Sequence, residues 1–365
     1  MVKIIKKGEI VSLIGKYPVD QGILAEINQL DLHSQPNENQ VVVFLSFRAR
    51  VLSGGEIEQP LQSDPLIDPS EILPMIILEN GLLVVQLGKR RSYGEGIEVK
   101  GSSKEIYDAL TIDSQGGVRH AVELVPRENI GSNYTIAVAE ELLIDEYNKC
   151  RRFQGHPNIV ESYSIYSKLM TDGSERFVHL QRAYEGAITR LFYNTLELAL
   201  VDRGQKFLKD YISIFYGYTK GLMEIHKVGV HGDVSPLNIF YFRTSHGFYQ
   251  GVVGDLEGFC EGESGAKIFS AALTEFIAPE VKSQVTRASD IYSLGTTVMA
   301  IRDRFIYQVV CKLVEDQDRH LEVAGKFNKE VFDPLGVGDL IGAMMEPEPT
   351  ARPSIGDVHI AFKEI

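Results

Sequence analysis

Three polar residues in the second half of the sequence have the types and spacing that phosphoryl transfer needs. Asp233 and Asn238 lie in the stretch HGDVSPLNIF, and Asp255 follows in VVGDLEG after an apolar run. The chemistry calls for a carboxylate that accepts the proton of an attacking hydroxyl, and for an Asn and an Asp that hold magnesium on a nucleotide. We therefore interpret Asp233 as the candidate base and Asn238 and Asp255 as candidate metal ligands.

Two predicted helices would help to position these residues. Residues 208–226 predict a helix that leads into the HGD loop, because apolar residues recur on one face. Residues 135–153 predict another helix, and Glu146 falls beside its apolar stripe, so we expect its carboxylate to face the same interior. The two apolar faces consist of Ile212, Phe215, Leu222 and Ile225, and of Ala139, Leu143, Tyr147 and Cys150.

A β-hairpin is predicted ahead of these helices. From Val99 the sequence reads VKGSSKEIYDAL, then a Gly-Gly turn, then VRHAVELV, which indicates strand, turn and strand. Gly101, Ser102 and Ser103 are small residues at which a backbone could approach a phosphate. An ordinary turn without a ligand accounts for the same residues.

The segment 1–94 carries no recognisable chemistry. Residues 41–51 alternate apolar and polar side chains, which predicts a half-buried strand. Residues 76–87 form two apolar runs about Asn80-Gly81, a dipeptide that favours a tight hairpin. We expect a small β-rich region here, a scaffold rather than a peptide-binding module.

Composition excludes several classes of protein. Of the 365 residues, 44% are hydrophobic and 24% charged, which is enough for a sizeable core. The formal charge of −13 argues against nucleic-acid binding, which needs a basic face. No apolar run is long enough to span a membrane, and the 3 cysteines are too scattered for a zinc site or a disulfide framework. We expect a cytoplasmic protein without nucleic-acid or membrane partners.

Six motifs occur in an order that resembles the eukaryotic-type protein kinases. They are Glu146 followed by GHPNIV, then HGDVSPLN, DLEG, the triplet Ala278-Pro279-Glu280, SDIYSLG and PTARPS. The resemblance covers residues 95–365 and implies an α+β, two-lobed fold. Its β-rich lobe would span 95–180 and its mainly helical lobe 187–365, behind the β-rich segment 1–94.

The same resemblance implies the cofactors and the residues that bind them. ATP with Mg²⁺ would lie between the lobes, with Gln181 and Ala183 contacting the nucleotide at a hinge near 181–186. Asp233 would be the base, and Asn238 and Asp255 the metal ligands. Glu146 would be the acidic partner of the phosphate-binding lysine. Two structural roles carry over as well, an ion pair between Glu280 and Arg352 and a loop held by Asp290 through backbone amides.

The phosphate-binding lysine is missing from its usual strand. Residues 120–124 read HAVEL, without a lysine. Lys104 instead stands where the third glycine of the phosphate loop would be, in GSSKEIY. This arrangement resembles the with-no-lysine kinases, which carry the lysine at that loop position and keep its Glu partner. We predict that Lys104 takes the missing role, and the alternative is a surface lysine on a turn.

The catalytic loop departs from the family pattern in three further places. Gly232 replaces the usual Arg, so a phosphorylated activation segment would lack its common basic partner. Ser235 replaces a lysine that many Ser/Thr kinases direct at the γ-phosphate. DLE replaces the usual DFG-like triplet, and Glu257 in it would either bind metal or restrict movement of the segment. All three changes lower the expected turnover.

The sequence therefore predicts an ATP-dependent protein kinase-like protein that phosphorylates Ser or Thr hydroxyls of protein substrates. One alternative is a pseudokinase scaffold with weak or no catalysis. Another is a small-molecule phosphotransferase of the aminoglycoside and choline type, since HGD followed by a distant Asp-x-Glu occurs there too. The Ala-Pro-Glu triplet, Asp290 and Arg352 favour a protein substrate, because those enzymes normally lack them.

Overall fold

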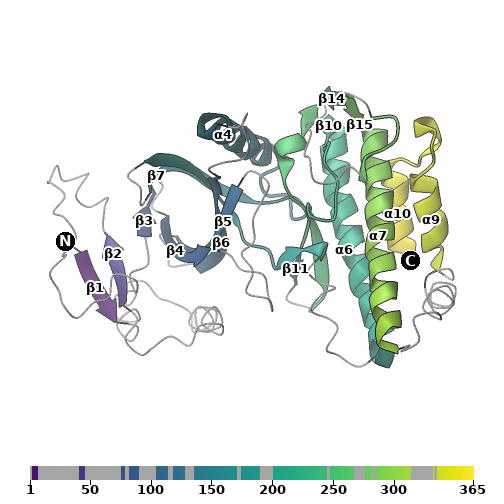
Figure 1. Cartoon of the computed structure of the whole chain (residues 1–365), viewed down its shortest axis with the longest axis horizontal. Helices are drawn as coiled ribbons and strands as arrows, with labels where there is room; N and C mark the ends of the chain where they lie inside the picture. Colours follow the sequence, from purple (N-terminus) through teal and green to yellow (C-terminus); the bar gives the residue numbers. More distant parts are fainter. Residues whose placement is uncertain are drawn as a thin grey trace. The chain divides into compact units, whose positions relative to one another are not determined.

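The chain forms a mixed α+β structure with two compact units. The first comprises residues 1–92, 97–139 and 163–183, and the second comprises 93–96, 140–162 and 184–365. The computed structural model in Figure 1 describes residues 2–6, 41–45, 75–78, 82–89, 104–113, 118–127, 135–170, 174–189, 200–244, 247–266, 276–281, 284–313, 332 and 335–365. The predicted phosphate-loop residues Gly101, Ser102 and Ser103 lie outside these ranges.

The first unit is built on a curled six-stranded sheet (Figure 1). Its strand order is β3-β4-β5-β6-β8-β7, with antiparallel pairing from β3 through to β8. The strands are β3 (Met75–Ile77), β4 (Leu83–Lys89), β5 (Lys104–Ile112), β6 (Val118–Pro126), β7 (Ser162–Leu169) and β8 (Glu175–Arg182). The predicted strand, turn and strand after Val99 is confirmed by β5 and β6.

The predicted strands of the segment 1–94 are also present where the structure describes that segment. Strand β3 pairs with β4 in a hairpin whose innermost pair is Ile77 and Leu83, around the predicted Asn80-Gly81 turn. The turn residues themselves lie outside the described ranges. Strand β2 (Val41–Leu45) begins where the alternating pattern begins, and it pairs antiparallel with β1 (Val2–Lys6).

The register of the sheet assigns its residues to two faces. Residues directly opposite each other in an antiparallel pair share a face, and neighbours along a strand alternate. Glu123 is opposite Tyr107 and Leu180, and it therefore lies on one face, which we call the Glu123 face. Val122 is opposite Asp108 and Gln181, so it lies on the other face. Lys104 and Asp108 are four residues apart on β5, so their side chains lie on the same face of the sheet. We call this second face the Lys104 face.

The second unit is mainly helical and carries the larger core. Helix α6 (Leu200–Val228) packs against α10 (Ile355–Glu364) and α7 (Arg287–Leu313), and α7 packs against α9 (Val337–Met344) (Figure 1). Of the predicted face of α6, Phe215, Leu222 and Ile225 are fully buried and Ile212 is half-buried. Among the described helices, none is both long and apolar enough to cross a membrane.

Short strands and one further helix complete the second unit. Helix α4 (Ile136–Arg152) agrees with the predicted range, and it begins at Thr135, whose Oγ1 accepts a hydrogen bond from the Val138 amide. Most of α4 belongs to this unit. The strands are β9 (Gly186–Ala187), β10 (Gly229–Val230), β11 (Ile239–Arg243), β12 (Tyr249–Val253), β13 (Cys260–Glu261), β14 (Ser264–Ala266) and β15 (Gln284–Thr286).

Candidate active site

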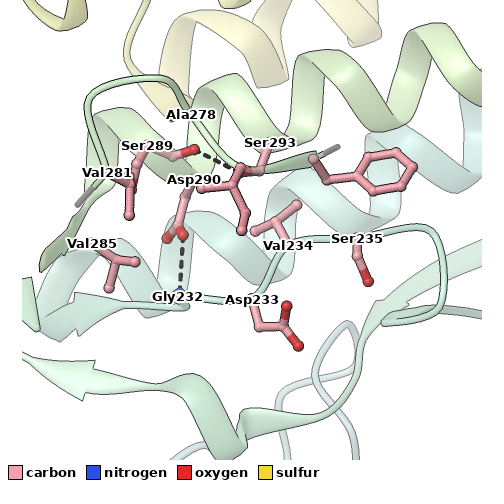
Figure 2. A pocket seen from close by; sticks show the side chains of 12 residues that line it. Gly232, Asp233, Val234, Ser235, Ala278, Val281, Val285, Ser289, Asp290 and Ser293 are labelled. Carbon is pink, nitrogen blue, oxygen red and sulfur yellow. Dashed lines mark hydrogen bonds between the residues drawn. The ribbon is translucent and has the colours of Figure 1, made fainter. Parts of the chain in front are cut away.

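The loop after β10 is held in place by one buried carboxylate. Asp290, near the start of α7, is 2% exposed and accepts hydrogen bonds from the backbone amides of His231 at 2.8 Å and Gly232 at 3.0 Å. It also lies 2.9 Å from Nε2 of His226, at the end of α6. Figure 2 shows the Asp290 carboxylate directed at the Gly232 backbone. The predicted role of Asp290 as the support of this loop is confirmed.

The same loop brings Asp233 and Asn238 into direct contact. The Asn238 amide nitrogen donates to the Asp233 carboxylate at 2.9 Å and to the Asp233 carbonyl at 2.8 Å. The His231 ring accepts from the Asp233 amide at 3.2 Å, and its other nitrogen lies 3.1 Å from the carbonyl oxygen of Gly254. This ring therefore connects the loop to the residue that precedes Asp255.

Asp255 stands in a tight turn directly after β12. Its backbone has φ of 51°, in the left-handed region that side chains other than glycine rarely adopt. It caps the short 3₁₀ helix η5 (Leu256–Gly258), and its Oδ1 accepts a hydrogen bond from the Glu257 amide at 3.3 Å. Leu256 is fully buried, so the turn is anchored in the core beneath it.

The electrostatics of the site favour a bound cation. Burial raises the pKa of Asp233, and the negative charge of Asp255 raises it further. A divalent cation beside both carboxylates would relieve this repulsion. The Asp255 carboxylate and the Asn238 amide oxygen are donors that suit Mg²⁺, which usually keeps several waters and takes one or two carboxylates. The described residues contain no cluster of three His, Cys, Asp or Glu side chains arranged for a metal.

Two glycines bring the loop and the Asp255 turn into backbone contact. Gly232 has φ of +79°, and a Cβ placed on it would lie 2.6 Å from the carbonyl oxygen of Gly258. A Cβ on Gly258 would in turn lie 2.9 Å from the carbonyl oxygen of His231. No side chain fits at either position without movement of the backbone. The packing around Gly232 thus requires a glycine there.

A small cavity lies between this loop and the segment that carries Ala278. Its volume is about 30 Å³, room for about one water molecule and far too small for a nucleotide. In Figure 2 the Asp233 carboxylate points away from α7. Ser235 also lines the cavity, and its buried hydroxyl has no hydrogen-bond partner among the described residues. The lining residues are Gly232, Asp233, Val234, Ser235, Phe276, Ile277, Ala278, Val281, Val285, Ser289, Asp290 and Ser293.

The predicted ion pair between Glu280 and Arg352 is confirmed. Arg352 donates through both terminal nitrogens to the Glu280 carboxylate, at 2.6 and 2.8 Å. Burial acts to raise the pKa of Glu280, but the hydrogen bonds and charge of Arg352 together with a backbone hydrogen bond outweigh it, and the pKa lies below its usual value. Because the Arg352 side chain is fully buried, this bidentate pair fixes the segment before α7.

The Lys104 face of the sheet carries two of the predicted nucleotide-binding residues, Lys104 and Gln181. Lys104 is 8% exposed, and Gln181 on the same face is 4% exposed. Val122 of β6 lies on that face, between β5 and β8. Strand β6 contributes no lysine to it. The Ala183 amide donates to the His120 carbonyl at 3.0 Å. Lys104 therefore shares a face with Gln181.

Glu123 lies on the opposite face in a network that the sequence did not reveal. It is 0% exposed, and Lys168 of β7 donates to both its oxygens at 2.9 and 2.7 Å. Gln86 donates to it at 2.6 Å, and the Tyr166 hydroxyl donates to it as well. Because side chains alternate along a strand, the position of Glu123 next to Val122 on β6 could have indicated that the two side chains lie on opposite faces.

Glu146 faces the interior, as its helical position predicted. It is 1% exposed on α4, on the same stripe as Ala139, Leu143 and Cys150. Tyr147, the fourth residue of the predicted stripe, is only half-buried. Lys104 and Glu146 belong to different units, and the pairing of these two residues stays a prediction.

Comparison with known proteins gives one weak similarity. No known family model matches the chain. Over 134 aligned residues the chain is 31% identical to a probable serine/threonine-protein kinase of Dictyostelium discoideum. The alignment covers 33% of this chain and only 8% of that much longer protein. The similarity indicates a kinase-like relationship for about a third of the chain.

Proposed function

We propose that the chain is a protein-kinase-like phosphotransferase that moves the γ-phosphoryl group of MgATP to Ser or Thr hydroxyls of protein substrates. The carrying observation is the loop in which Asn238 hydrogen-bonds to Asp233 while Asp290 fixes the backbone. The similarity to a probable serine/threonine-protein kinase supports the proposal. We also propose a kinase-like two-lobed fold, in which the six-stranded sheet is the β-rich lobe and the second unit is the helical lobe.

In this proposal each residue of the loop has a separate task. Asp233 orients the substrate hydroxyl and accepts its proton, and the hydrogen bond from Asn238 fixes the direction of the carboxylate. Asn238 and Asp255 would hold Mg²⁺, which when bound neutralises charge on the nucleotide phosphates. The pKa of Asp233, raised by burial and by Asp255, makes the ionised carboxylate a stronger base than an exposed Asp.

The phosphate-binding cation would come from Lys104. No lysine is present on β6, and Lys104 lies on the same sheet face as Val122 and Gln181. A fixed cation near the α- and β-phosphates is among the largest contributions to such a site. Glu146, which is buried on α4, would be its acidic partner, and Gln181 and Ala183 would contact the nucleotide.

A second candidate function is a nucleotide-binding pseudokinase with weak or no transfer. The observation that favours it is β6 itself, where Glu123 is buried in a charged network and no lysine is present. A small-molecule phosphotransferase has less support, because the Glu280–Arg352 pair and the Asp290 contacts match protein-kinase signatures.

A direct assay separates these functions. The full chain is incubated with labelled MgATP and a generic protein acceptor, in parallel with Asp233→Asn and with aminoglycoside and choline acceptors. We expect protein labelling by the wild type and none by the variant. Equal labelling by both proteins, or none by either, would favour the pseudokinase, and labelling of a small acceptor alone would favour the third class. Thermal stabilisation by ATP, with and without Mg²⁺, then separates nucleotide-binding from non-binding pseudokinases.

A further inference from the structure

The last turn of α4 is bonded to the segment that follows Asp255. Lys149 donates from Nζ to the carbonyl oxygen of Glu257 at 2.7 Å, across 108 residues of sequence. The same ammonium group pairs with Asp145 one turn earlier, also at 2.7 Å. The Lys149 side chain is 17% exposed, whereas that of Asp145 is 55% exposed. The contact with Glu257 is therefore the better shielded of the two.

A second contact between α4 and this segment is apolar. The Phe153 ring, just after α4, meets the Phe259 ring edge-on at a centroid distance of 5.4 Å, and both residues are buried. Arg152 lies over the Phe259 ring at 5.8 Å and pairs with Glu261, in an exposed position where ion pairs contribute little. The packing brings α4 and the segment together without fixing the peptide of Glu257.

That peptide needs fixing because the turn before it is strained. Asp255 adopts φ of 51°, and a residue other than glycine in this region persists only when its surroundings enforce it. The N–H of Glu257, which belongs to the preceding peptide group, donates a long 3.3 Å hydrogen bond to Asp255 itself. The carbonyl of Glu257 is held by Lys149, from an element far away in the sequence.

We propose that Lys149 is a positioning residue for the metal ligand Asp255. By holding the Glu257 carbonyl, it keeps the turn in the conformation that directs the Asp255 carboxylate, so metal binding depends on the placement of α4. The role toward Mg²⁺ rests on the proposed function, whereas the effect on the turn does not. Partners that orient metal ligands commonly alter metal affinity when they are removed.

Two variants separate positioning from simple helix stabilisation. Lys149→Met removes both contacts of the ammonium group, whereas Asp145→Asn removes only the charge of the exposed partner and leaves the bond to Glu257. Hydrogen exchange of the full chain without nucleotide should show faster exchange at the amides of residues 257–259 in Lys149→Met. Asp145→Asn should match the wild type, and Lys149→Arg should restore protection in part. Equal exchange in Lys149→Met and the wild type would overturn the proposal.

The metal role is tested by titrating Mg²⁺ and recording the thermal stabilisation by ATP. We expect Lys149→Met to need about ten-fold more Mg²⁺ for half of the effect, with Asp145→Asn unchanged. If the wild type responds to Mg²⁺ and Lys149→Met responds identically, the proposal about Lys149 is wrong and the proposed function survives. If the wild type itself shows no response to Mg²⁺, the proposed function fails and the metal role of Lys149 fails with it.

Discussion

The two units arrange their charged residues in opposite ways. The helical unit gathers Asp233, Asp255 and Asp290 around one loop, where each accepts a hydrogen bond from a backbone amide or from Asn238. The sheet unit separates its charges, with Lys104 on one face and the Glu123–Lys168 pair on the other. One unit concentrates negative charge in a single site, and the other distributes its charged residues over two faces by the alternation of its strands.

This difference teaches how much change each region tolerates. In a strand, neighbouring side chains enter different environments, so Val122 and Glu123 are independent although they are adjacent. A substitution on the Lys104 face of β5 or β6 should therefore leave the network on the Glu123 face undisturbed. In the loop, Gly232 and Gly258 contact each other through their backbones, and a change at one position affects both segments.

The largest expected effect tests the Glu123 face of the sheet. Lys168→Met should lower the free energy of unfolding by about 3–5 kcal/mol, because it leaves Glu123 buried and charged without its cation. Urea unfolding of the full chain measures this. The matched control is Lys104→Met, a lysine of the same sheet on the other face. A loss below about 1 kcal/mol for Lys168→Met would mean that Glu123 is not a structural anion.

The next effect tests the Lys104 face of the sheet. Lys104→Met should lower the rate of phosphoryl transfer about 10²–10³-fold, the usual cost of one missing electrostatic group. Met keeps the apolar stem of a side chain that is only 8% exposed, so the fold should persist. Initial rates with MgATP measure the effect, with circular dichroism to confirm folding. Full activity in this variant would refute the role given to Lys104.

A smaller effect is expected from a substitution of Glu123, the anionic partner of Lys168. Glu123→Gln should leave phosphoryl transfer largely intact, since Glu123 faces away from Lys104. It should lower the free energy of unfolding by about 1–3 kcal/mol, because Lys168 loses a charged acceptor but keeps a polar one. Rates and urea unfolding of the same preparation measure both. A loss of transfer as large as that of Lys104→Met would contradict the separation of the faces.

The smallest effect concerns the crowded site of the helical unit. The folded-state pKa of Asp233 is raised, so protonated Asp233 favours the folded state. That contribution is fully present below the unfolded pKa and is lost as pH rises through the folded pKa. Asp233→Asn should therefore be more stable than the wild type at neutral pH without Mg²⁺, with the gain shrinking toward acid pH. Urea unfolding across pH measures it, and a variant less stable at neutral pH would contradict the charge crowding.

Much of the fold could be predicted from local patterns. The helical period located α4 and α6 and directed Glu146 inward, and the alternating pattern located β5 and β6. The kinase resemblance correctly predicted that Glu280 pairs with Arg352 and that Asp290 supports the HGD loop through backbone amides. These successes share one physical basis, since spacing along a strand or a helix fixes the direction of a side chain.

Most of the missed features depend on contacts between distant segments. The bond from Lys149 to the Glu257 carbonyl spans 108 residues, and no spacing rule indicates it. The cation for Glu123 comes from β7, so the sequence of β6 alone could not show that this carboxylate is paired. The positive φ of Gly232 is equally invisible, because glycine permits such a conformation without requiring it.

The contact between Gly232 and Gly258 also bears on how this chain can evolve. Any other residue at this position would place a Cβ 2.6 Å from a carbonyl oxygen, at a left-handed φ. A substitution at Gly232 alone should therefore be strongly disfavoured, because both backbones would have to move together. Variation at this position is expected in descendants of this sequence only where the segment around Gly258 changes with it.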